Sequence, residues 1–177
     1  TGYQRVNDGA VMKKFEDAWG VSGLSDKPGL TITGMIAAAH RGDLKALYIM
    51  GENPLMSDPD VTHVERSLSN LDFLVVQDIF LTETAALADV VLPAACFAET
   101  EGTYTNTDRR VQLSRKAVDP PGQARADWEI VAEVCNRCGL AADYRGPDDI
   151  MQEINKLTPS YAGITHSRLS LGYGLAW

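Results

Sequence analysis

The sequence has no run of apolar residues long enough to cross a lipid bilayer, and it is poor in cysteine and in positive charge. Three cysteines in 177 residues are too few for a disulfide scaffold. The 24 Asp and Glu outnumber the 16 Lys and Arg, which gives a net charge of −8. This charge argues against nucleic acid or an anionic membrane as the main partner. A nucleotide remains compatible with it, because backbone N–H groups at helix starts can hold phosphates.

Several motifs of known chemistry are also missing. There is no G-x-G-x-x-G fingerprint, no Walker loop and no G-x-S-x-G nucleophile elbow. The histidines, His40, His63 and His166, are too scattered to indicate a metal site or a catalytic triad, and we interpret them as surface or core residues. The chain has no signal peptide and does not begin with Met, so we expect it to be a piece of a longer protein.

One pair of cysteines has a spacing that often carries chemistry. Cys135 and Cys138 form a C-x-x-C near the end of a predicted helix. A thioredoxin-type pair lies at a helix start, where the helix dipole lowers the thiol pKa. A zinc site would need two more ligands at suitable spacing, and the sequence offers none. We therefore interpret both cysteines as small packing residues.

Short apolar runs alternate with helical patterns from Asp43 to Pro93, in the order β-α-β-α-β. The runs are continuous rather than alternating, which is typical of strands covered on both faces. Alternation with helices indicates parallel strands joined by right-handed crossovers. The predicted fold is α/β, with a three-layer αβα domain around a mainly parallel, Rossmann-like sheet. The predicted strands are 44–50, 72–78 and 89–93, and the predicted helices in and before this region are 9–19, 31–41, 59–71 and 81–88.

After Pro93 the pattern is less regular. Two β-prone arms, 102–107 and 109–118, flank a polar turn near Asp108 and predict either a hairpin or a long irregular loop. Helices are predicted at 127–140 and 148–157, each opened by Asp. The tail, 158–177, is rich in Gly and aromatic residues and would need a surface to pack against. The predicted division is a helical flank over 1–42, the αβα domain over 43–140, and a C-terminal helix with an irregular tail over 141–177.

Polar residues follow the predicted strands where each of them ends. Gly51, Asn53 and Ser57 come after the first strand, and Gln77 and Asp78 end the second. In parallel α/β sheets, ligands bind beyond the carboxyl ends of the strands. Gly51 permits a sharp turn there, while Asn53 and Ser57 offer short hydrogen-bonding groups. These residues predict a site for a nucleotide-like ligand and do not by themselves indicate a reaction.

Acidic residues near the same strand ends leave a second interpretation open. Asp58, Asp60 and Asp78 would also suit Mg²⁺, which prefers oxygen ligands. However, Asp58 and Asp60 precede a predicted helix, where a carboxylate side chain commonly accepts hydrogen bonds from the first turn. We therefore predict that these two residues are helix caps.

Three stretches together resemble the molybdopterin-dependent oxidoreductases. They are ALYIMGENPLMSDPD, LDFLVVQDIFLTETAALADVVLPA and AETEGTYTNTDRRVQ. The opening TGYQRVNDG and the later DWEI narrow the resemblance to the catalytic subunit of formate dehydrogenase. The resemblance runs along almost the whole chain. The alternatives are the matching region of another member, such as a nitrate reductase, or a stand-alone α/β binding module.

The resemblance implies a larger enzyme that converts formate and carbon dioxide at a molybdenum or tungsten ion. Molybdopterin guanine dinucleotides hold that metal, and one αβα domain binds the guanosine end of one dinucleotide. The resemblance also implies a [4Fe–4S] cluster elsewhere in the parent chain. Expected partners are the remaining domains of that chain and iron–sulfur electron-transfer subunits, with no nucleic acid or membrane contact. A cytoplasmic location is implied, with the periplasm as the alternative.

The resemblance also assigns cofactor contacts to particular residues. Those assigned are Gly51, Asn53, Ser57, Gln77, Asp78 and Asp127. Asp127 is placed beside the guanine, where its two oxygens can accept from N1–H and the exocyclic amine. Some relatives have Asp in place of Asn53. No residue of this chain matches a catalytic or metal-ligating position of the family, so the chain by itself is expected to be inactive.

Overall fold

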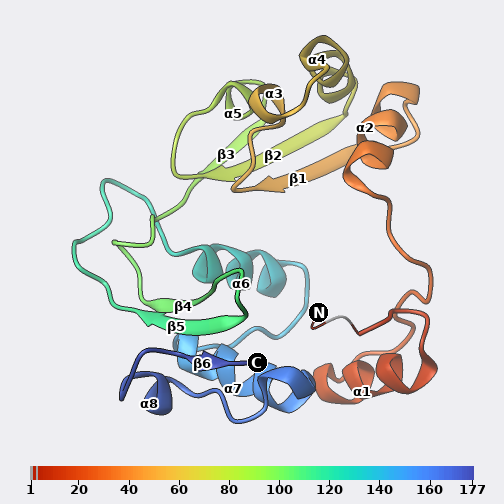
Figure 1. Ribbon diagram of the computed structural model, residues 1–177. Coiled ribbons are helices and arrows are strands. Elements are labelled where there is room, and N and C mark those ends of the chain that lie inside the picture. The colour runs from red at the N-terminus through yellow and green to blue at the C-terminus, as the bar shows by residue number, and fades with distance from the viewer. Residues whose placement is uncertain (1, 3) are drawn as a thin grey trace. The chain divides into compact units, whose positions relative to one another are not determined.

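In the computed structural model, which describes Gly2 and residues 4–177, the chain forms two compact units (Figure 1). The parallel-sheet unit comprises Leu30–Thr100 and Ala117–Ala141. The antiparallel-sheet unit comprises the described residues up to Gly29, with Glu101–Lys116 and Ala142–Trp177. None of the helices in the described part of the chain is long and apolar enough to span a membrane.

The parallel-sheet unit confirms the β-α-β-α-β prediction. Its three strands are parallel in the order β1-β2-β3, and Ile49, Val76 and Val91 lie side by side in the register. The fold is therefore α/β, as predicted. Its elements are α2 (Ile32–Arg41), β1 (Ala46–Met50), α3 (Pro54–Ser57), α4 (Val61–Ser69), β2 (Phe73–Asp78), α5 (Glu83–Ala86), β3 (Val90–Pro93) and α6 (Asp127–Arg137).

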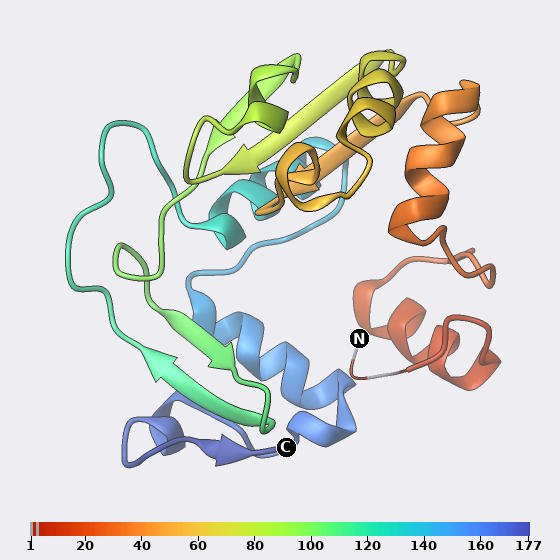
Figure 2. The ribbon, with the colours of Figure 1, turned by 45° about the horizontal axis from the view of Figure 1, so that its top comes forward.

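The core of this unit lies between one face of the sheet and the helices α2, α4 and α5. Its buried members are Ile36, Ile49, Val64, Leu68, Leu74, Val76 and Ala85. Helices α3, α4 and α5 lie on that side of the sheet and α6 on the other, which Figures 1 and 2 both show. The side facing α6 is less covered than the sequence predicts, because Tyr48 and Met50 remain 40% and 50% exposed.

The start of α4 corrects one prediction. Asp60 is the N-cap, and its carboxylate accepts a hydrogen bond from the His63 N–H at 3.1 Å. Asp58 instead accepts from the Asp60 N–H at 2.9 Å, which makes a turn before the helix. The cap prediction was therefore correct for Asp60 and wrong for Asp58. The short helix α3 was not predicted from the sequence.

The antiparallel-sheet unit resolves the alternative left open for the arms around Asp108. They form the hairpin of β4 and β5, and β6 from the tail pairs with β5. Arg109 occupies a left-handed conformation (φ 64°) at the turn. The elements are α1 (Gly9–Trp19), β4 (Gly102–Thr105), β5 (Arg110–Ser114), α7 (Pro147–Leu157), the 3-10 helix η1 (Pro159–Tyr161), α8 (His166–Leu169) and β6 (Leu175–Ala176).

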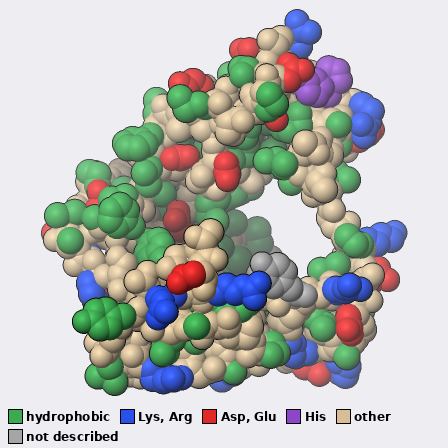
Figure 3. Space-filling view, in the orientation of Figure 1, with side chains coloured by type: hydrophobic (Ala, Val, Ile, Leu, Met, Phe, Trp, Pro, Cys, Tyr) green, Lys and Arg blue, Asp and Glu red, His purple; other side chains and the backbone are tan. Residues whose placement is uncertain are grey.

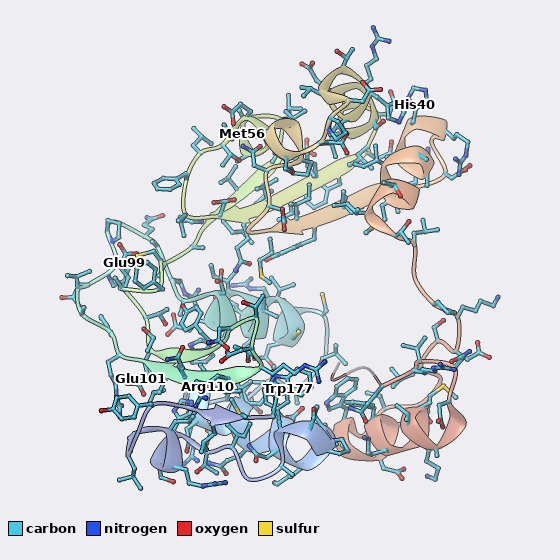
Figure 4. The ribbon with its side chains drawn as sticks, in the orientation of Figure 1. His40, Met56, Glu99, Glu101, Arg110 and Trp177 are labelled. Atoms are coloured by element: carbon cyan, nitrogen blue, oxygen red, sulfur yellow. The ribbon has the colours of Figure 1, made fainter. Side chains whose placement is uncertain are left out.

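The tail packs against the hairpin of its own unit. Val111 of β5 is fully buried and clusters with Met151, Ile164 and Leu169. Trp177 stacks on Tyr161 with ring centroids 5.3 Å apart. Figure 4 shows Arg110 and Trp177 together beside this sheet. The Gly-rich and aromatic tail therefore finds the packing surface that it requires.

The division of the chain at residues 42 and 140 stays a prediction.

The hairpin is inserted into the chain of the parallel-sheet unit. The chain leaves this unit after Thr100 and returns at Ala117. At the base of this excursion, the backbone N–H groups of Ala117 and Val118 both donate to the Ala98 carbonyl, at 2.8 and 3.1 Å. Two points 19 residues apart are thus fixed together by backbone hydrogen bonds.

Candidate functional site

The carboxyl ends of the three parallel strands lie at one edge of the sheet. In the register, Met50 is opposite Gln77, and Asp78 is opposite Pro93. The Gly51 N–H donates to the Gln77 carbonyl at 2.9 Å, and Gly51 then takes a left-handed conformation (φ 65°) that favours glycine. The chain can therefore turn away from the sheet directly after β1.

Gln77 and Asp127 are 50 residues apart in sequence and in direct contact. The Gln77 side chain is fully buried, and its Nε2 donates to the Asp127 Oδ1 at 2.5 Å. The Tyr48 hydroxyl donates to the Gln77 Oε1. A buried amide with both of its ends bonded is held in one orientation. Burial, together with the negative charge of Asp127, raises the pKa of Tyr48.

Asp127 is the first residue of α6, but it does not cap the helix. The N-cap is Ala126, and no side chain caps α6. Asp127 is exposed, and among the described residues Gln77 is the one whose hydrogen bond reaches its carboxylate. Asp127 therefore presents an exposed carboxylate that can accept further hydrogen bonds, and the buried amide of Gln77 fixes its position.

Asn53 has a structural task at the same edge. Its Oδ1 accepts from both the backbone N–H and the hydroxyl of Thr84, at 3.3 and 2.7 Å. Its Nδ2 donates to Glu83 at 2.8 Å, and this hydrogen bond is the main cause of the lowered pKa of Glu83. The buried Thr84 hydroxyl also accepts from the Leu55 N–H at 3.2 Å. Asn53 therefore ties the loop after β1 to the start of α5.

Among the described residues, the side chains of Ser57 and Asp78 make local hydrogen bonds only. The Ser57 hydroxyl donates to the Asn53 carbonyl at 3.2 Å, four residues back. Asp78 accepts from the Phe80 N–H at 3.2 Å and shapes the turn after β2. Of the six residues assigned to the cofactor, Gln77 and Asp127 are thus the pair whose side chains bond to each other.

The other chemistry-bearing side chains do not gather into a further centre. No three His, Cys, Asp or Glu side chains of residue 2 or residues 4–177 are arranged to hold a metal ion. The rings of His40 and His63 pack against each other with centroids 4.7 Å apart, and Figure 3 shows histidine side chains on the surface of this unit. Figure 4 places His40 on α2 and Met56 on α3. Cys135 and Cys138 are both free thiols.

Three residues of the site were not identified from the sequence: Tyr48, Glu83 and Thr84. The signal for Tyr48 lies in the strand register. Tyr48 is opposite Val75, so it shares a face of the sheet with Gln77 two residues on. The alignment of β1 with β2 would reveal this pair, but the sequence alone does not fix that alignment. The Thr84 hydroxyl donates to Asn53, a contact between positions 31 residues apart that no local sequence pattern indicates.

Relatives match the chain from end to end. It is 56% identical over 178 residues to "F420-dependent formate dehydrogenase subunit alpha" of Methanocaldococcus jannaschii, which covers 99% of this chain and 26% of that protein. It is 48% identical to "F420-dependent formate dehydrogenase 1 subunit alpha" of Methanococcus maripaludis, with the same coverage. It is 47% identical to "Probable oxidoreductase YjgC" of Bacillus subtilis, covering 18% of that protein. The chain therefore spans about a quarter or less of the length of these relatives.

A solved structure and a protein family match as well. Acetylene hydratase from Pelobacter acetylenicus superposes with a TM-score of 0.67 at 22% identity, over 98% of this chain and 24% of that one. This likeness confirms the fold alone. The molybdopterin oxidoreductase family matches residues 8–137, which is well over half of the chain. On this match, the chain belongs to the molybdopterin oxidoreductase family.

Proposed function

We propose that this chain binds the guanosine end of a molybdopterin guanine dinucleotide, as part of the catalytic subunit of a formate dehydrogenase. The names of the relatives from Methanocaldococcus and Methanococcus support the enzyme class. The position of the polar residues at the carboxyl edge of a parallel sheet supports the kind of ligand. Iron–sulfur electron-transfer subunits and the remaining domains of a longer chain are the proposed partners, and the cytoplasm is the proposed location.

The observation that carries the proposal is the exposed Asp127 carboxylate held by the buried Gln77 amide. Guanine presents two adjacent donors, N1–H and the exocyclic amine, on one edge. A carboxylate accepts both at once, whereas adenine presents an acceptor and a donor there. Each carboxylate oxygen has two lone pairs, so the hydrogen bond from Gln77 leaves both oxygens of Asp127 available. The residues of the site therefore fit a guanine base.

The remaining assigned residues serve this site in different ways. Gln77 is fully buried and supports Asp127 rather than touching the ligand. Gly51 lets the backbone turn where the ligand would approach the sheet. Asn53 holds the loop after β1 against α5, and it keeps one amide N–H for the ligand. Ser57 and Asp78 keep unused acceptor positions at the same edge.

The bound cofactor would supply the molybdenum or tungsten centre at which formate is oxidised. The residues of this chain would bind and orient one end of that cofactor, while the metal ligand and the [4Fe–4S] cluster belong to other parts of the parent enzyme. The 177-residue chain is accordingly expected to show no formate-dependent reduction of a redox dye. Dye reduction above a control without protein would contradict this division of roles.

A titration of the purified chain with GDP and with ADP tests the proposed ligand. The wild-type chain should bind GDP more tightly than ADP. In Asp127→Asn, an amide N–H replaces one acceptor and opposes the guanine donors, so the affinity for GDP should fall about 10- to 100-fold. The affinity for ADP should change little, and isothermal titration calorimetry measures both constants.

Asp148 provides a matched control in the antiparallel-sheet unit. It also lies in the first turn of an 11-residue helix, it is exposed, and it accepts a hydrogen bond from the amide of Gln152 at 3.0 Å. Asp148→Asn should leave the affinity for GDP unchanged. Equal affinity of the wild-type chain for GDP and ADP, or an equal loss in both variants, would contradict the proposed function.

A further inference from the structure

We propose that Tyr48 is a positioning residue for the guanine site, and that its hydroxyl sets the nucleotide preference of Asp127 by fixing the amide of Gln77. This inference rests on the proposed function. The Tyr48 hydroxyl bonds to Gln77 and reaches Asp127 only through the Gln77 amide. The three side chains form a relay that runs from β1 through β2 to the start of α6.

The parallel register creates the first contact of the relay. Tyr48 is opposite Val75, and Gln77 lies two residues further along β2 on the same face. The long tyrosine side chain spans this diagonal, and its hydroxyl reaches the Gln77 Oε1. Tyr48 itself stays 40% exposed, so it is only partly buried and is not a member of the core.

The chemistry of the three groups fixes the direction of both hydrogen bonds. An ionised carboxylate only accepts, so the Gln77 group that faces Asp127 must be the Nε2 donor. The Gln77 Oε1 must then face Tyr48. Because a carbonyl oxygen only accepts, the tyrosine hydroxyl must donate its proton. The order of donors and acceptors therefore admits one arrangement from Tyr48 to Asp127.

Loss of the Tyr48 hydroxyl would remove the donor that holds this arrangement. The buried Oε1 of Gln77 would then lack a partner, and rotation of the amide would become less costly. A rotated amide would place its oxygen against the Asp127 carboxylate and repel it. Asp127 would lose its fixed orientation, which two simultaneous hydrogen bonds to guanine require and a single hydrogen bond to adenine does not.

The test uses Tyr48→Phe in the 177-residue chain, because this change keeps the ring and removes only the hydroxyl. The affinity for GDP should fall about tenfold, and the affinity for ADP should stay as in the wild type. Tyr144→Phe is the matched control, since the Tyr144 hydroxyl donates to Glu153 at 2.7 Å in the antiparallel-sheet unit. That variant should keep the wild-type affinity for both nucleotides.

A double-mutant cycle separates positioning from a general structural role. Gln77→Met removes the amide at similar length, so Tyr48→Phe should cause no further loss of GDP affinity in that background. Nuclear magnetic resonance provides a readout without ligand. The Gln77 side-chain amide protons should exchange slowly with solvent in the wild type, because they are buried, and at least tenfold faster in Tyr48→Phe.

The outcomes distinguish this inference from the proposed function. If Tyr48→Phe keeps the wild-type ratio of GDP to ADP affinity while Asp127→Asn loses it, the role of Tyr48 is refuted and the proposed function stands. Additive losses from Tyr48→Phe and Gln77→Met would refute the relay in the same way. If the wild-type chain shows no preference for GDP, both the proposed function and the inference fail.

Discussion

The two units of this chain use opposite ways of building a sheet. The parallel-sheet unit takes its three strands from one stretch of sequence, Ala46–Pro93, and connects them by helices. The antiparallel-sheet unit assembles its sheet from a hairpin and from the last residues of the tail, Leu175–Ala176. Its helices α1 and α7 come from segments more than 120 residues apart.

This difference explains what each unit offers chemically. In the parallel-sheet unit, three strands end at one edge of the sheet. There the buried side chains of Gln77 and Thr84 donate hydrogen bonds to Asp127 and Asn53, respectively. The antiparallel unit buries Val111 under the tail and closes its sheet with aromatic residues. The first unit therefore carries the candidate site, and the second carries a closed apolar core. Four predictions probe this comparison.

The largest effect is expected from a cavity in either core. Leu74→Ala in β2 removes a buried side chain that is 2% exposed and should lower the free energy of unfolding by about 2–5 kcal/mol. Hydrogen exchange should lose protection first in β1, β2 and β3. Met151→Ala, the counterpart in the other unit, should instead expose β5 and α7. Equal loss of protection in both units from either variant would show that they unfold as one.

A smaller loss of stability should follow when one buried hydrogen-bonding side chain of the parallel-sheet unit is removed. Thr84→Val removes the hydroxyl that donates to Asn53 and accepts from the Leu55 N–H, at almost unchanged volume. Buried groups left without partners should cost about 1–3 kcal/mol of unfolding free energy, measured by urea denaturation. Ser57→Ala, which removes an exposed hydroxyl nearby, should cost about 0.5 kcal/mol or less. A similar cost for both would mean that Thr84 does not tie α3 to α5.

The two aspartates before α4 should differ in the same assay. Asp60→Ala removes the N-cap and should cost about 0.5–2 kcal/mol. Asp58→Ala removes only a turn hydrogen bond to the Asp60 N–H and should cost less. A larger loss in Asp58→Ala would restore Asp58 as the residue on which the helix start depends.

The smallest effect concerns alkaline pH. The pKa of Tyr48 is raised above its ordinary value of 10.0, mainly by burial, so the folded chain binds this proton more tightly than the unfolded chain. The contribution to stability is fully present below pH 10.0 and is lost as the pH rises through the folded pKa. Tyr48→Phe should flatten this part of the profile of unfolding free energy against pH. If the slope is the same in Tyr48→Phe and in the wild type, the ionisation of Tyr48 does not cause this loss of stability at alkaline pH.

The sequence predicted the parallel unit well because its signals are local. The helix predicted over 31–41 is α2, and the structure makes Thr31 its N-cap and Gly42 its C-cap. Gln77 and Asp127 were assigned to the cofactor separately, and their contact was not predicted, since no local pattern joins positions 50 residues apart. Tyr48 was missed because its role depends on strand register. The third strand of the antiparallel sheet was missed because the tail has no periodic pattern of its own.

The backbone hydrogen bonds to Ala98 have a consequence for how this chain tolerates insertion and deletion. Residues 101–116 leave the parallel-sheet unit and return to it, and the hydrogen bonds from Ala117 and Val118 to Ala98 hold the two ends of this segment together. The entropic cost of closing a flexible loop grows only with the logarithm of its length, by about 0.6 kcal/mol for each doubling. Lengthening or shortening this segment should therefore leave the strands β1 to β3 folded. The hairpin can therefore vary in length without disturbing the carboxyl edge of the parallel sheet.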